Sequence, residues 1–251
     1  MARSVDEIKN LRFIIEYLGL CRHTTTLYYS KVLIEKPISG IYIVPSADNV
    51  REWHGVIFPH QGFYVSGVFK FVLSFPLQYP EKPPQIIFCT PIFHPLVDPL
   101  TMELNLRAKF QTWNPSIQCE DPKCPSRDVL LYLKNVLYET SYWDNRTYCF
   151  HKNAYNAYIQ WKRHLELQKH DQNTTMLLSS EEFPRYVKQC VDESIQAMYR
   201  PVKTYDRFAV NFDDAKRTSE VQVFEVIKNF KVNFLKKFYL FFFNDWCNIK
   251  Q

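Results

Sequence analysis

Cysteine has the widest range of covalent and metal chemistry among the side chains of this chain, and seven cysteines are scattered along it: Cys21, Cys89, Cys119, Cys124, Cys149, Cys190 and Cys247. A thiolate can act as a nucleophile or as a zinc ligand. Cys119 and Cys124 could join Cys149 and His151 at a zinc ion, but the ligand pairs of structural zinc sites are usually spaced more closely. We therefore predict free thiols on a proline-stiffened loop, with no metal and no cofactor.

The other side chains that could do chemistry do not gather in the sequence. Asp98, Glu103 and Glu120 are too scattered for a pair of catalytic carboxylates, and the five glycines form no phosphate-binding loop. The net charge of +5 comes without a basic motif, which argues against nucleic acid as a partner.

The cysteine pattern and the N-terminus both bear on location. An odd number of scattered cysteines is typical of a reducing compartment rather than of a disulfide framework. The first residues include acids and lack the apolar run of a secretory signal. No apolar segment of about eighteen residues is present, so we expect no transmembrane span. The prediction is a cytoplasmic protein.

Hydrophobic periodicity predicts which elements carry these residues. Helices are expected over 5–20 and 25–36, and Pro37 ends the second because proline does not suit a helix interior. Four strands separated by turn signals follow, with no helix between them: 41–44, 53–58, 67–75 and 85–89. This order predicts an antiparallel meander.

The third strand has the clearest pattern. Phe69, Phe71, Leu73 and Phe75 alternate with Lys70, Val72 and Ser74, the period of a half-buried strand. We expect a core that contains Trp53, Phe69, Phe71 and Ile86.

Helices are expected again in the second half of the chain. One is predicted over 126–138, with Ser126 at its start, and others over 152–168 and 181–199. A run of strands followed by a run of helices predicts an α+β domain.

Four motifs in order allow a comparison with a known family. Trp53-His-Gly-Val-Ile-Phe and Tyr64-Val-Ser-Gly-Val-Phe precede a proline-rich turn with Tyr79-Pro80 and Pro83-Pro84, and His94-Pro95 and Trp113-Asn-Pro-Ser follow. Their order and spacing resemble the ubiquitin-conjugating (UBC) domain. The resemblance implies the UBC fold, a four-stranded antiparallel sheet flanked by helices, over about residues 24–165.

The same resemblance shows what this chain lacks. The family has His-Pro-Asn followed, roughly eight residues later, by the cysteine that carries ubiquitin as a thioester; here Leu96 stands at the asparagine position and Asn105 at the cysteine position. An amide is neither a good nucleophile nor a good leaving group, and Leu96 offers no hydrogen-bond donor for an oxyanion. We predict a pseudoenzyme, with His94 bonded to backbone groups. The competing hypothesis is an active enzyme that uses Cys89 or Cys119.

Within that family, the segment Gly40–Ser46 and especially Phe93-His-Pro-Leu-Val-Asp-Pro are similar to the FTS group, which includes the insect Crossbronx proteins. The group lacks the catalytic cysteine. The resemblance implies an adaptor in vesicle or endosome trafficking, beside Hook-family coiled-coil proteins and dynein. The alternative is a ubiquitin-binding variant that assists an active conjugating enzyme. Cys119–Pro125 and the C-terminal region depart from the group.

We predict three parts: an N-terminal extension (1–23), the UBC-like domain (24–165) and a C-terminal helical extension (166–251). Within the extension, residues 221–246 are aromatic and basic, and apolar residues at helical spacing form one face. Such a helix can pack on its own domain, dock in a groove of a partner or lie on an anionic membrane, such as that of an endosome. The predicted docking face consists of Val223, Ile227, Phe230, Phe234, Phe238 and Phe241.

Overall fold

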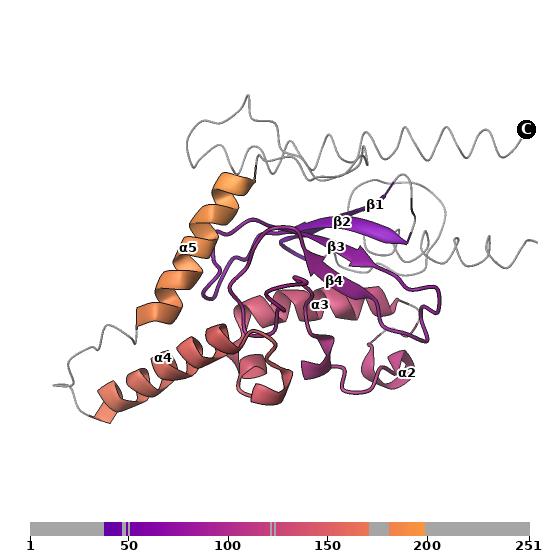
Figure 1. Cartoon of the computed structure of the whole chain (residues 1–251). Helices are drawn as coiled ribbons and strands as arrows, with labels where there is room; N and C mark the ends of the chain where they lie inside the picture. The colour runs from indigo at the N-terminus through magenta and orange to yellow at the C-terminus, as the bar shows by residue number, and fades with distance from the viewer. Residues whose placement is uncertain are drawn as a thin grey trace, which may run out of the picture. The chain divides into compact units, whose positions relative to one another are not determined.

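The computed structural model describes residues 38–46, 49, 51–120, 122, 124–170 and 181–198 (Figure 1). The helices predicted over 5–20 and 25–36 and the segment 221–246 lie outside these residues, so they stay predictions. No helix in the described ranges has the length and apolar character that crossing a membrane requires.

Four strands form one antiparallel sheet in chain order: β1 (Ile41–Pro45), β2 (Glu52–Ile57), β3 (Phe69–Ser74) and β4 (Gln85–Phe88). The predicted meander is confirmed. Gly55 in β2 pairs with Phe71 in β3, and a Cβ at Gly55 would lie 2.4 Å from the Phe71 ring. Glycine is therefore required at this position for the ring to lie across the neighbouring strand.

One residue of β3 departs from the predicted alternation. Lys70, expected on the exposed face, is only 4 % exposed, whereas Val72 and Ser74 are half-buried. Strand β3 pairs with β2 on one edge and with β4 on the other, so it is an inner strand of the sheet. The residues of an inner strand are more buried than those of a strand at the edge. Burial lowers the pKa of Lys70 to about 8.

The helices follow the sheet in the sequence. They are α2 (Pro115–Gln118), α3 (Pro125–Tyr138), α4 (Lys152–His170) and α5 (Glu182–Ala197), with short 3₁₀ turns η1 (Leu106–Ala108), η2 (Thr140–Trp143) and η3 (Arg146–Tyr148). Figure 1 shows α3 running along one face of the sheet. The α+β fold class and the UBC fold are thereby confirmed.

The start of α3 corrects one prediction. Ser126 does not cap the helix: Cys124 is the N-cap, Pro125 occupies the first turn and Ser126 is fully buried inside the helix. Proline at this position lacks only an N–H that would have had no helical partner, so the helix can begin at Pro125, one residue before the predicted start. The predicted core is confirmed, since Trp53, Phe69, Phe71 and Ile86 are each at most 1 % exposed.

Helix α5 lies within the predicted C-terminal extension (166–251), and it packs against the same domain as the sheet. The Val68 N–H donates to Ser194 Oγ at 2.9 Å, and the Phe93 N–H donates to Cys190 Sγ at 3.4 Å. The Phe183 side chain is fully buried. The compact body thus extends well beyond residue 165.

Candidate functional site

Asn105, at the position of the family's thiol, has hydrogen-bond partners for all its polar groups. Its side-chain Nδ2 donates to the Tyr148 carbonyl at 2.8 Å, and its Oδ1 accepts from the Arg107 N–H at 3.0 Å. Its backbone N–H donates to the Leu96 carbonyl at 2.9 Å, and its carbonyl accepts from the Tyr132 hydroxyl at 2.7 Å. The residue is 5 % exposed. Asn105 caps η1 and offers no accessible group to a substrate.

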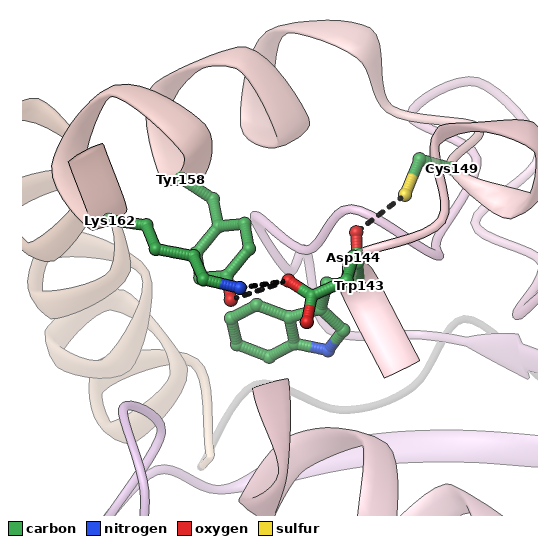
Figure 2. Close-up of polar contacts among 5 residues, drawn as sticks. All are labelled: Trp143, Asp144, Cys149, Tyr158 and Lys162. Atoms are coloured by element: carbon green, nitrogen blue, oxygen red, sulfur yellow. Dashed lines mark hydrogen bonds and ion pairs between the residues drawn. The ribbon is translucent and has the colours of Figure 1, made fainter. Parts of the chain in front are cut away.

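The segment that supplies the Tyr148 carbonyl runs through η2 and η3, and it is tied to α4 (Figure 2). Asp144 Oδ1 lies 2.6 Å from Lys162 Nζ and accepts a hydrogen bond from the Tyr158 hydroxyl at 3.2 Å. The Cys149 thiol donates to the Trp143 carbonyl at 3.5 Å. Because Trp143 is fully buried, this segment is anchored by packing as well as by polar contacts.

His94 lies beneath the same region and bonds to backbone groups only. Its Nδ1 accepts from the Leu96 N–H at 3.0 Å, so Nε2 carries the proton and donates to the Val136 carbonyl at 3.0 Å. His94 is fully buried, and this burial lowers its pKa to about 4. The ring therefore stays neutral at physiological pH and connects the His94–Leu96 turn to the end of α3, as predicted.

Leu96 and the other motif residues serve packing and loop geometry. Leu96 is fully buried and brings no donor to the site. The Trp113 Nε1 donates to the Pro80 carbonyl at 2.6 Å, which ties the proline-rich turn to the segment before α2. Tyr79, Pro84 and Pro95 are buried, and Pro83 is half-buried.

The five thiols of the described residues are not gathered into a site. Cys119 and Cys124 are buried, and no cluster of three or more metal-ligating side chains occurs among the described residues. Cys89, predicted to lie inside a strand, follows the last residue of β4 and is exposed. Burial nevertheless raises its pKa, an effect that Lys70 partly offsets. Cys89 therefore has no lowered thiol pKa in its favour, and Cys119 is buried.

The sequence analysis missed two features: the residue that covers Asn105, and the packing of α5 against the domain. Tyr148 acts through its backbone carbonyl, which no sequence pattern reveals. The contribution of α5 had a readable signal, since Phe183, Val187, Cys190 and Ser194 recur at helical spacing. That spacing predicts a buried face, although it does not say which surface the face covers.

The fold agrees with the comparison of this sequence with known proteins. The profile of the ubiquitin-conjugating enzyme family matches residues 28–166, more than half of the chain, and the chain belongs to this family. It is 36 % identical over 128 residues to the AKT-interacting protein of Danio rerio and 34 % identical over 128 residues to that of Homo sapiens.

Each of these two alignments covers 51 % of this chain and 39 % of the relative. The chain therefore matches less than half the length of these relatives. The similarity to AKT-interacting proteins confirms the resemblance to the FTS group.

Proposed function

We propose that this protein is a non-catalytic adaptor that binds other proteins in vesicle and endosome trafficking, beside Hook-type dynein adaptors. The observation that carries the proposal is Asn105, which is buried and has hydrogen-bond partners for all its polar groups. Thioester transfer needs an exposed thiol at this place, and the chain has an amide bonded to its own backbone. Protein binding is the function that remains for a UBC fold without this chemistry.

The neighbourhood of Asn105 supports the same proposal. Opening the site would break the Asn105–Tyr148 hydrogen bond and disturb the contacts of Asp144 with Lys162 and Tyr158. An opened site would still lack an oxyanion donor, because Leu96 is fully buried and has no hydrogen-bond donor in its side chain. The surface outside the site is therefore where we expect function.

The partner is expected in the cytoplasm, where the protein would act as a peripheral component on endosomal membranes. The relatives are named for an interaction with AKT, which makes AKT a further candidate partner. Ubiquitin is the competing candidate, since a UBC fold could hold it without transferring it.

Affinity purification of the tagged chain from cells, followed by mass spectrometry, tests the proposal. We expect Hook proteins and dynein subunits to be enriched over a tag-only control and over a tagged, active ubiquitin-conjugating enzyme. Enrichment of ubiquitin and active conjugating enzymes without Hook proteins would replace the adaptor function with the ubiquitin-binding one. Recovered Hook proteins should then bind the purified chain directly.

A further inference from the structure

Two cavities lie side by side along α5. The first has a volume of about 350 Å³ and the second of about 330 Å³, and both are lined by Phe93 and Tyr186. The first lies between α4 and α5, and the second between α5 and the segment 91–102. We call the pair the α5 groove. It is separate from the closed position of Asn105.

The α4 wall of the α5 groove consists of side-chain amides. Asn153, Asn156 and Gln160 lie three and seven positions apart, so they share one face of the helix. All three are exposed, and their amides make no hydrogen bond within the described part of the chain. A side-chain amide offers both a donor and an acceptor. A row of such amides matches the alternating C=O and N–H groups of an extended peptide backbone, whatever its sequence.

The second cavity is mainly apolar. Ile92, Pro99 and Met102 line it on one side and Cys190 on the other, and the rings of Phe93 and Tyr186 lie 5.1 Å apart. The Cys190 thiol donates to the Pro91 carbonyl, and burial raises its pKa to about 11, so it carries no charge there. This cavity suits one apolar side chain.

The charge of the α5 groove is negative. Glu182 and Glu193 line its two cavities, no lysine or arginine appears among the described lining residues, and neither carboxylate forms an ion pair with a described residue. His151 is kept neutral because burial lowers its pKa. Outside the lining, the Arg185 guanidinium lies over the Tyr186 ring at 5.2 Å.

The two carboxylates are also suitably spaced. Glu182 and Glu193 are eleven positions apart on α5, which corresponds to about 16 Å along the helix. An extended chain covers that distance in about five residues. A short peptide could therefore reach both carboxylates while one of its side chains enters the apolar cavity.

We propose that the α5 groove binds an extended peptide segment of a partner protein in which an apolar residue is flanked by lysine or arginine. The apolar side chain enters the cavity beside Phe93 and Tyr186, the α4 amides bond the peptide backbone, and the basic side chains pair with Glu182 and Glu193. The inference rests on the proposed adaptor function in requiring a protein partner, and it adds where and by what chemistry that partner is held.

Selection from a phage-displayed library of random linear peptides on the immobilised full chain tests the inference. Selected peptides should carry an apolar residue with lysine or arginine on either side. One selected peptide, labelled with a fluorophore, is then titrated with the protein. We expect Glu182→Lys with Glu193→Lys to weaken its affinity by about ten-fold, because each lost pair of this kind contributes modestly and a reversed charge repels the peptide.

Glu181→Lys with Asp192→Lys is the matched control. It reverses the same number of charges at the sequence neighbours of the two groove glutamates, the N-cap of α5 and a residue in its second half. Both are exposed and lie outside the groove lining. We expect the affinity to change by less than about two-fold. Glu182→Gln with Glu193→Gln should give an intermediate loss, and this variant avoids introducing new positive charge on α5.

Equal losses in the groove variant and its control would overturn the inference. So would selected peptides that are acidic, or ones that bind only as helices by circular dichroism. This result can be separated from the adaptor function. If affinity purification recovers Hook proteins but the library yields no binding peptide, only the peptide-binding role of the α5 groove is overturned. If the library yields a basic peptide but no Hook protein is recovered, only the trafficking role is overturned.

Discussion

At the residue scale, one substitution accounts for the proposed loss of chemistry, and the surroundings of Asn105 make that loss hard to reverse. The absence of a thiol between Cys89 and Cys119 is visible in the sequence. The burial of the position is not, because it depends on the carbonyl of Tyr148, more than forty residues away. A sequence pattern can show which side chain stands at a position, but not which backbone group will cover it.

We predict that the chain forms no ubiquitin thioester and that Asn105→Cys does not restore one at a normal rate. The loss of one oxyanion donor costs about a hundred- to a thousand-fold in rate in other enzymes, and Leu96 has none. The new thiol would also lie at a position that is 5 % exposed. The measurement is the reductant-sensitive adduct formed with activating enzyme, ATP and ubiquitin.

An active ubiquitin-conjugating enzyme in a parallel reaction serves as the positive control. An adduct on the unmodified chain that disappears with Cys89→Ser or Cys119→Ser would contradict the pseudoenzyme proposal. Efficient charging of Asn105→Cys would mean that the position of Leu96 has been given the wrong role.

His94 should make stability depend on pH. Its pKa is about 4 in the folded chain, against about 6.5 when unfolded, so between these values the unfolded state binds more protons. Stability should therefore rise from pH 4 to about pH 6.5 and then level off. The contribution is about 3 kcal/mol at most. The physical cause is the full burial of the ring, which disfavours its charged form.

Urea unfolding as a function of pH measures this slope. His94→Gln removes the titrating group and should flatten the curve, although the variant will be less stable at every pH. His151→Gln, which changes the half-buried histidine whose pKa is also lowered, is the control and should keep most of the slope. An unchanged slope in His94→Gln would assign the pH dependence to other groups.

At the scale of elements, local patterns predict the sheet and the helices, but not their partners. Alternation in β3 and turn signals between strands were enough for the antiparallel meander. They did not reveal that Lys70 would be buried, because its cover depends on neighbours distant in the sequence. Similarly, the helix predicted over 181–199 exists as α5, yet nothing local says that Ser194 receives the Val68 N–H.

We predict that α5 is needed for the stability of the whole domain. Phe183 is fully buried, with Phe63, Trp143 and Tyr158 at ring distances of 5.2, 5.7 and 5.6 Å. Phe183→Ala should reduce the free energy of unfolding by about 3 kcal/mol and Tm by about 6–12 °C, because it leaves a cavity in an aromatic cluster. Thermal unfolding followed by circular dichroism measures the shift.

Tyr186→Ala is the control on the same helix. Its side chain is 39 % exposed, so its removal should cost less than about 1 kcal/mol. If Phe183→Ala melted like the unmodified chain, α5 would be an appendage rather than part of the core. The α5 groove would then lack a stable wall.

At the scale of the whole molecule, four motifs in order predicted the family, because each marks a turn or strand that the UBC fold needs at that place. These motifs say nothing about the two ends of the chain. The family profile matches residues 28–166, and the segment 221–246 lies beyond both that match and the described residues. Its function has to be argued from its pattern: six apolar residues on one helical face, with Lys228, Lys231, Lys236 and Lys237 over much of the remainder.

We predict that this apolar face is needed for association and dispensable for folding. Phe230→Asp with Phe234→Asp places two charges on the face, and moving a charge from water into an apolar contact is strongly unfavourable. Binding to a partner, or to vesicles that contain anionic lipids, should therefore be lost. We expect Tm to move little, because the buried residues Trp53, Phe71 and Ile86 come from β2, β3 and β4.

Asn229→Asp with Asn233→Asp is the matched control, since it adds the same two charges away from the apolar face of the predicted helix. Co-sedimentation with vesicles and co-precipitation with Hook proteins separate the two kinds of docking. Equal loss of binding in both variants would indicate that net charge, rather than the apolar face, controls association. A large fall in Tm with the phenylalanine variant alone would mean that the segment packs on its own domain, because only a buried face destabilises the fold when it is charged.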